Sequence, residues 1–129
     1  MPLVRDHMSR DLLSTEPAEA IAVVAQRMVE RNLGAVLVLE SGRLAGIMTE
    51  RDIMRAVARG LHGDAVVADH MSRDPETIEP DDTMEHAAVL MIHGGFRHLP
   101  VVEHGSVVGI LSIRDLMRVG LEDSAPRGV

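Results

Sequence analysis

An internal repeat constrains the fold of this chain more than any other feature of its sequence. The stretch VRDHMSRD at residues 4–11 recurs as VADHMSRD at residues 67–74, an offset of 63. With that offset and no gap, residues 4–57 align with residues 67–120, and 20 of the 54 positions are identical. Chance gives only a few identities at this length, so we infer a duplicated unit. Two copies are too few for a solenoid, and we expect a pseudo-twofold pair in which each half covers the other's apolar face.

The first part of each copy predicts a short extended segment and then an amphipathic helix. The extended segments are LLST at 12–15 and ETI at 76–78. We expect Pro17 near the start of the first helix, and a capping pattern from Asp82 to Glu85 at the start of the second. Apolar residues at helical spacing predict the buried faces, Ile21, Val24, Ala25 and Met28 in copy one and Met84, Ala87, Ala88 and Met91 in copy two.

The second part of each copy predicts a hairpin followed by another helix. Glycine-containing turns at 41–42 and 104–105 join AVLVLE to RLAGIM and HLPVVE to SVVGIL. The second helix of each copy is expected to begin after Thr49 or Ser112. Pro100 cannot donate a hydrogen bond to a ladder, so we expect it at a sheet edge or a strand start.

The order β-α-β-β-α, present twice, defines the predicted fold. We predict an α+β protein of two tandem, pseudo-twofold related repeats, each with a small mixed sheet and helices on one face. Halves of about 60 residues are marginal alone, so we expect them to pack as one module. The predicted boundaries are repeat one at 1–60, a linker at 61–66, repeat two at 67–121 and a frayed tail at 122–129.

Composition excludes several classes of partner. The net charge is −7, from 13 basic and 20 acidic side chains, which opposes non-specific binding to nucleic acid or anionic lipid. One phenylalanine without tryptophan or tyrosine leaves no aromatic platform for stacking bases. The apolar runs are too short to span a bilayer, the N-terminus does not resemble a signal peptide, and there is no cysteine. We predict a cytoplasmic protein without nucleic-acid or membrane partners.

The same strand-to-helix corner occurs in GIMTERDIM at 46–54 and in GILSIRDLM at 109–117. Its polar residues are Thr49 and Asp52 in copy one and Ser112 and Asp115 in copy two. One interpretation is a capping box, in which hydroxyl and carboxylate satisfy backbone N–H groups. The other is a ligand site, because a helix start can bind phosphate and a carboxylate can accept both hydroxyls of a ribose. A hydroxyl that caps its helix can also serve a ligand, so the two interpretations are compatible.

The preceding strands carry Gly46 and Gly109, where a missing side chain allows close approach to the backbone. With these corners, the duplicated pattern resembles a pair of cystathionine-β-synthase-type (CBS) domains, also called a Bateman module. The openings DHMSRD and the stretch FRHLPVVE are similar to that family as well, and the resemblance covers roughly residues 3–121. It implies a regulatory module that binds AMP, ADP, ATP, S-adenosylmethionine or NAD(H) in clefts between paired repeats. Occupancy would be transmitted by a change of conformation or assembly, without catalysis.

The resemblance also implies roles for individual residues. It implies ribose binding by Asp52 and Asp115, phosphate binding by Thr49, Ser112, Arg97 and His98, and an adenine slot lined by Ser14, Thr15, Thr77 and Ile78. The copies differ at Arg97 and His98, where copy one has Gly34 and Ala35. One cleft should therefore bind a polyphosphate better, although the sequence does not assign which. The alternative for Arg97 is a solvated loop arginine.

Other functional classes have less support in the sequence. No nucleophile with its base and no phosphate-binding loop motif is present, so we predict no enzyme. His7 and His70 lack the spacing of a zinc site, and we predict no metal. Of the nine methionines, most belong to the core, and the others suit an adaptable interface of a homodimer. The alternative function is a ligand-free interaction module whose corners are caps only, and in either case the effector protein is not identified by the sequence.

Overall fold

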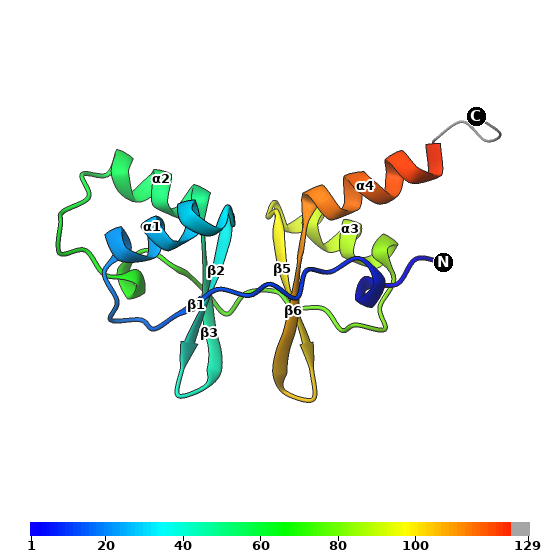
Figure 1. Ribbon diagram of the computed structural model, residues 1–129, viewed down its shortest axis with the longest axis horizontal. Coiled ribbons are helices and arrows are strands. Elements are labelled where there is room, and N and C mark those ends of the chain that lie inside the picture. Colours follow the sequence, from blue (N-terminus) through cyan, green and yellow to red (C-terminus); the bar gives the residue numbers. More distant parts are fainter. Residues whose placement is uncertain (125–129) are drawn as a thin grey trace. The chain divides into compact units, whose positions relative to one another are not determined.

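The computed structural model describes residues 1–124, and this part of the chain forms two compact units. The first-repeat unit spans Leu12–Pro75. The second-repeat unit combines Met1–Asp11 with the described chain from Glu76 onward. Each unit contains helices and strands, and its two main helices lie on the same side of its hairpin (Figure 1). The predicted α+β class with two repeats is confirmed, while the packing of the two halves as one module stays a prediction.

The first-repeat unit contains a mixed four-stranded sheet. Its elements are β1 (Ser14–Thr15), α1 (Ile21–Arg31), β2 (Ala35–Glu40), β3 (Arg43–Thr49), α2 (Glu50–Ala58), the short 3-10 helix η2 (Val67–Asp69) and β4 (Ser72–Arg73). The strand order is β1-β2-β3-β4, with β1 parallel to β2 and the other pairs antiparallel. Ser41 and Gly42 have φ values of 52° and 77°, as a two-residue hairpin turn of type I′ requires.

The second-repeat unit repeats this topology with shorter outer strands. Its elements are η1 (Val4–Asp6), α3 (Met84–Gly94), β5 (His98–Glu103), β6 (Ser106–Ser112) and α4 (Ile113–Ser124). The outer strands are reduced to isolated bridges, a parallel one from Ile78 to Val101 and an antiparallel one from Ser9 to Ile110. The hairpin predicted between β5 and β6 is present, with the same turn geometry at 104–105.

Pro100 explains why the parallel ladder is short in this unit. In the first-repeat unit Leu37 N–H donates to the Leu13 carbonyl at 2.9 Å. Pro100 occupies the equivalent position and has no N–H to donate, so one bridge at Ile78 remains, where the Pro100 carbonyl accepts from Ile78 N–H at 3.1 Å. Pro100 lies in an edge strand, as expected, because β5 and β6 form a two-stranded sheet. It lies inside β5 rather than at its start. Its missing N–H is at the position where the parallel pairing of β5 with Ile78 ends.

Two helices begin later than the sequence pattern suggested. α1 begins at Ile21, and Pro17 lies in the preceding turn, where its carbonyl accepts from Ala68 N–H at 2.9 Å. α3 begins at Met84, and its N-cap is Thr83 rather than Asp82. The Asp82 carboxylate instead accepts from Glu79 N–H at 3.1 Å and stabilises the turn. In the second copy the Pro80 carbonyl likewise accepts from Arg5 N–H at 2.9 Å. In both copies the turn thus binds a segment distant in sequence, which local residue patterns do not reveal.

The C-terminal boundary of the second repeat also differs from the prediction. α4 continues to Ser124, so residues 122–124 of the predicted frayed tail are helical. Residues 125–129 of that tail lie outside the described residues.

Each unit has its own apolar core, and the two cores are built from equivalent positions. The first core contains Ile21, Val24, Met28, Val36, Val38, Met48 and Val67. The second contains Met84, Ala87, Met91, Leu99, Val101, Leu111 and Val4 at the same repeat positions, and adds Ile78. The predicted inward faces of α1 and α3 are confirmed by these lists. Ala25 and Ala88 of those faces are half-buried.

The two opening segments, which we define as residues 2–11 and 65–74, each complete the core of the opposite repeat. Val4 is fully buried in the second core and Val67 is fully buried in the first. Val4 N–H donates to the Asp82 carbonyl at 2.8 Å, and Val67 N–H donates to the equivalent Glu19 carbonyl at 2.9 Å. The compact units are therefore offset from the sequence repeats by one opening segment.

Candidate functional site

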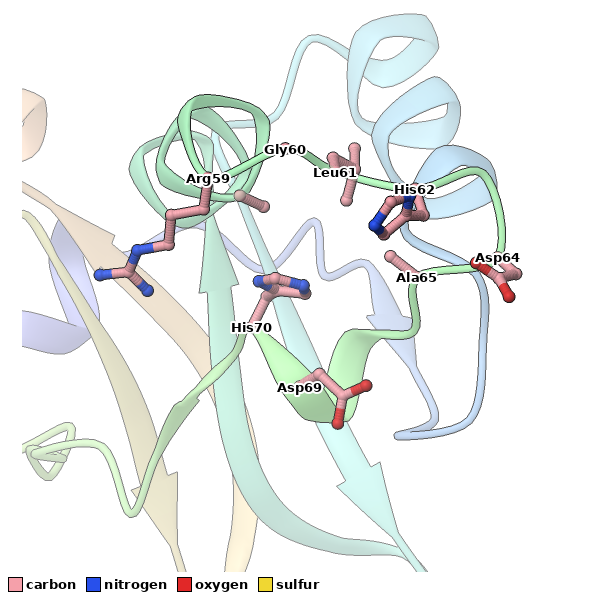
Figure 2. A pocket seen from close by; sticks show the side chains of 9 residues that line it. Arg59, Gly60, Leu61, His62, Asp64, Ala65, Asp69 and His70 are labelled. Carbon is pink, nitrogen blue, oxygen red and sulfur yellow. The ribbon is translucent and has the colours of Figure 1, made fainter.

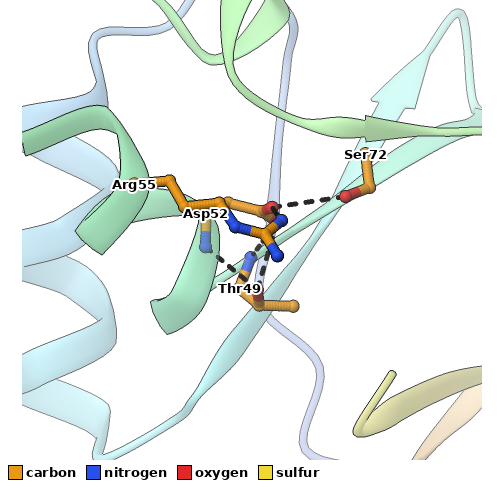
Figure 3. Close-up of polar contacts among 4 residues, drawn as sticks. All are labelled: Thr49, Asp52, Arg55 and Ser72. Atoms are coloured by element: carbon orange, nitrogen blue, oxygen red, sulfur yellow. Dashed lines mark hydrogen bonds and ion pairs between the residues drawn. The ribbon is translucent and has the colours of Figure 1, made fainter. Parts of the chain in front are cut away.

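The corner of the first-repeat unit is a capping box at the start of α2. Thr49 has the extended backbone of an N-cap, and its hydroxyl accepts from Asp52 N–H at 3.3 Å. Asp52 Oδ2 accepts in return from Thr49 N–H at 2.9 Å and from the Thr49 hydroxyl at 3.1 Å (Figure 3). The capping interpretation of this corner is confirmed.

The corner of the second-repeat unit has the same geometry at the start of α4. Asp115 Oδ2 accepts from Ser112 N–H at 2.8 Å and from the Ser112 hydroxyl at 3.1 Å. Asp115 N–H donates to the Ser112 hydroxyl oxygen at 3.3 Å. The duplicated sequence motif therefore builds the same local structure twice.

The second oxygen of each aspartate lies outside the cap. Asp52 is only 6% exposed, and its Oδ1 accepts from the Ser72 hydroxyl at 3.3 Å and lies 4.0 Å from Arg55 Nη1. Asp115 Oδ1 lies 3.5 Å from Arg118 Nη1. Because the cap uses Oδ2 alone, the Oδ1 atoms can accept further hydrogen bonds, and a capping role does not exclude a ligand role.

The glycines of the corners accommodate the opening segments. A Cβ on Gly46 would lie 2.6 Å from the Ser72 carbonyl oxygen, and one on Gly109 would lie 2.6 Å from Met8 Sδ. The close approach predicted at these positions is therefore made by the chain itself. The repeated opening sequence was the available signal, but only the fold places it beside the glycines.

Arg97 and His98 lie beside the corner of the second-repeat unit. The Arg97 carbonyl accepts from Ile113 N–H, the first residue of α4, at 2.8 Å, and His98 pairs with Ser112 across the hairpin. In the first-repeat unit the equivalent positions are Gly34, whose carbonyl accepts from Glu50 N–H at 3.0 Å, and Ala35. The difference in charge that the sequence indicated is thus located at one identified corner.

The four residues of the predicted adenine slot have different environments. Ser14 and Thr77 are exposed. Ile78 is 3% exposed and packs in the second core, whereas Thr15, its equivalent, is 5% exposed and donates its hydroxyl to Glu19. The side chains of Thr15 and Ile78 are thus directed into their units, and the slot stays a prediction.

A polar network around Glu19 was missed by the sequence analysis. Arg27 Nη2 lies 2.6 Å from Glu19 Oε1. The hydrogen bond from Thr15 and the nearby Arg27 guanidinium lower the pKa of Glu19 below its ordinary value, against the opposing effect of burial. The second repeat has Ile78, Asp82 and Leu90 at these positions, so the network is specific to the first-repeat unit.

Two cavities in the first-repeat unit lie away from its corner. One of about 380 Å³ is lined by the end of α2 and the segment after it, including Arg59, His62 and His70 (Figure 2). The other, of about 340 Å³, includes Ser14, Thr15 and the hairpin turn.

Over residues 1–124, no group of three histidine, aspartate or glutamate side chains could hold a metal ion. In the same range, no helix has the length and apolarity needed to cross a membrane.

Comparison with known proteins gives relatives over nearly the whole chain. The CBS domain-containing protein YhcV of Bacillus subtilis is 35% identical over 117 residues, which are 90% of this chain and 84% of that protein. An uncharacterized 17.7 kDa protein of Acidianus ambivalens is 40% identical over 109 residues, which are 83% of this chain and 66% of the relative. The chain spans smaller shares of other relatives, such as 22% of a homoserine O-acetyltransferase of Methanohalophilus mahii.

The fold and a family model agree with these relatives. The CBS domain pair of protein MJ0100, solved in complex with 5′-methylthioadenosine and S-adenosyl-L-methionine, superposes with a TM-score of 0.88. It is 26% identical, and the match covers 95% of this chain and 98% of that one. The CBS domain model matches residues 4–59 and again residues 67–122. The chain therefore belongs to the CBS domain family and contains two copies of the domain.

Proposed function

We propose that the chain is a regulatory module that binds an adenosine-containing ligand at its two corners. The observation that carries this proposal is the geometry of Asp52 and Asp115, whose Oδ2 atoms cap a helix while their Oδ1 atoms lie outside the cap. A vicinal diol can donate to such an oxygen, and a hydrogen bond to a charged group is worth about 1.5–3 kcal/mol. The adenosyl ligands of the related MJ0100 pair contain this diol and support the assignment.

The phosphate of a nucleotide would be held by the helix starts. The hydroxyls of Thr49 and Ser112 and the first N–H groups of α2 and α4 provide donors and partial positive charge. Arg97 adds positive charge near Ser112 only, and His98 adds a polar ring there, so we assign the more highly phosphorylated ligands to the second-repeat corner. The exposed residues Ser14 and Thr77, with their backbone amides, are the proposed groups for the adenine edge.

The module would act through assembly and without catalysis of its own. Met54 on α2 and Met117 on α4 are repeat equivalents, and they are 65% and 61% exposed. We propose that these helix faces form a homodimer and that the dimer signals to an effector protein. A ligand can shift an equilibrium between two assembly states only through its different affinities for them.

A ligand-free interaction module is the second candidate. It is favoured by the complete capping box at both corners and by the hydrogen bond from Ser72 to Asp52, which partly satisfies the second oxygen. In that case the aspartates serve helix capping alone, and the module contributes only its surface.

Thermal unfolding with AMP, ADP, ATP, S-adenosylmethionine and NADH distinguishes these functions. A ligand at a hundred times its Kd stabilises the folded protein by about 2.7 kcal/mol, which raises Tm by several degrees. We expect at least one compound to do so. If none changes Tm, the interaction module is the better description.

Substitution of the aspartates then tests the site itself. Asp52→Ala and Asp115→Ala should each weaken binding at one corner by about 1.5–3 kcal/mol, as measured by titration calorimetry. Loss of the cap should reduce stability by only about 1 kcal/mol. Glu50→Gln is the matched control, because Glu50 is an exposed acidic residue in the same helical turn as Asp52. Unchanged affinity in both alanine variants would assign the carboxylates to capping.

A further inference from the structure

The two corners differ in the group that occupies the second aspartate oxygen. In the first-repeat unit the Ser72 hydroxyl donates to Asp52 Oδ1 at 3.3 Å (Figure 3). The equivalent serine of the other opening segment is Ser9, and its hydroxyl oxygen accepts from Asp11 N–H at 3.2 Å instead. The same sequence, HMSRD, thus places its serine in two different hydrogen-bonding environments.

The local backbone explains this difference. Ser72 belongs to β4 and pairs with Ile47, while Asp74 has a φ of 48° and donates its N–H to the Ala45 carbonyl at 3.3 Å. Asp74 N–H therefore does not engage the serine, and the Ser72 side chain reaches Asp52. The equivalent N–H of Asp11 is bonded to Ser9, which keeps that serine within its own segment.

The acceptor capacity of the two aspartates differs as a result. A carboxylate offers roughly four lone-pair sites, two on each oxygen. In both corners Oδ2 receives two donors from the cap residue. Asp52 Oδ1 also accepts from the Ser72 hydroxyl, which leaves one lone-pair site for a ribose that offers two hydroxyls. Asp115 Oδ1 lies 3.5 Å from Arg118 Nη1 in the following helical turn, and the equivalent serine, Ser9, is bonded to Asp11 N–H instead.

We propose that Ser72 competes with the ribose diol for Asp52, which makes the first-repeat corner the weaker of the two sites. This inference rests on the proposed function of the corners. A diol that binds Asp52 with both hydroxyls displaces the Ser72 hydroxyl. Ser72 lies on β4, which has only two residue pairs with β3, at Ser72 and Arg73. Ligand binding at this corner therefore loosens the pairing of β4 with β3. By linkage, stronger pairing of β4 with β3 weakens ligand binding.

Variants that each retain one intact corner, called single-corner proteins, allow AMP binding at the two sites to be measured separately by calorimetry. Asp115→Ala leaves the corner of Asp52, and Asp52→Ala leaves the corner of Asp115. Adding Ser72→Ala to the first protein should tighten AMP binding roughly threefold to tenfold, the scale of one intramolecular hydrogen bond. Adding Ser9→Ala to the second protein is the matched control and should leave the Kd unchanged. Ser72 is exposed, so its replacement should not affect folding.

Two further measurements sharpen the test. The gain from Ser72→Ala should disappear with 2′,3′-dideoxy-AMP, which lacks the diol. Hydrogen exchange in the Asp115→Ala protein should become faster at Ser72 and Arg73 when AMP binds. If Ser72→Ala leaves AMP affinity unchanged or weakens it, Ser72 is not a competitor and the inference is wrong. If AMP binds neither single-corner protein, the proposed function itself fails, and the inference falls with it.

Discussion

At the scale of single residues, the two repeats differ most clearly where Thr15 replaces Ile78. Ile78 adds apolar volume to the second core, whereas Thr15 places a hydroxyl at the same buried position. A buried hydroxyl is unfavourable unless it forms a hydrogen bond, and Glu19 provides the acceptor. Arg27 then balances the charge of Glu19. The first-repeat unit thus contains an ionic network where the second has apolar packing.

This network predicts a pH dependence of stability. The pKa of Glu19 is lowered in the folded protein, so ionised Glu19 stabilises the first-repeat unit at pH values above its pKa in the unfolded chain. That stabilisation is lost as the pH falls through the lowered, folded-state pKa. Glu19→Gln should therefore lower Tm by a few degrees at neutral pH and flatten its decline in acid. Calorimetric scans from neutral pH to pH 3 measure both effects.

Glu16→Gln is the control for this prediction, because Glu16 is an exposed acidic residue of the same unit, three positions before Glu19. The Glu19 variant and the parent protein should converge at low pH, since both then lack the charge. Parallel curves over the whole range would show that the carboxylate contributes through packing alone.

Local residue patterns predicted the caps but not their tertiary partners. Thr49 and Asp52 are three positions apart, and such spacing is sufficient to define a capping box. Ser72 is twenty positions from Asp52, so only the register of β4 against β3 brings them together. The polar network of Glu19 could have been suspected from the four-residue spacing of Thr15 and Glu19, but that spacing alone is common.

At the scale of elements, the opening segments are the parts whose packing differs from their place in the sequence. Val4 begins the first repeat and packs in the second core, while Val67 begins the second repeat and packs in the first core. The hairpins and the inward helix faces were predictable because they depend on neighbouring residues and on periodicity. The exchange of opening segments was not, because either core has the same apolar positions and accepts the same sequence.

This exchange predicts which unit each valine stabilises. Val4→Ala should destabilise the second-repeat unit, and Val67→Ala the first-repeat unit, by about 1–3 kcal/mol each, the cost of removing buried methyl groups. Hydrogen exchange should become faster in α3 and β5 for Val4→Ala, and in α1 and β2 for Val67→Ala. Val29→Ala is the control, because Val29 is 81% exposed. Faster hydrogen exchange in the repeat that contains the substituted residue would contradict the reciprocal packing of the opening segments.

At the scale of the whole molecule, exposed apolar side chains indicate assembly. Met54 and Val57 on α2 and Met117 and Leu121 on α4 are all at least 60% exposed. Apolar groups gathered on helix faces often mark an interface. The sequence predicted a role for methionines outside the core, but it could not say which ones, since Met28 and Met91 have similar local surroundings and are buried.

We therefore expect a homodimer with twice the 14.0 kDa mass of the chain when light scattering is measured during size-exclusion chromatography. Met54→Glu combined with Met117→Glu should convert it to a monomer, because charges at the interface would be buried without partners. Val29→Glu combined with Ile92→Glu places the same charges on exposed positions of α1 and α3 and should leave the dimer intact. A dimer that survives the first pair of substitutions would place the interface elsewhere.

The reciprocal use of the opening segments has a consequence for any cut between the repeats. A protease that cleaved near Gly63 would separate two fragments, and each fragment would retain the piece that the other fragment's core needs. Neither fragment could then fold completely by itself, although the pair could reassemble. Halves expressed from separate genes should behave in the same way, as a split protein whose parts are obligatory partners.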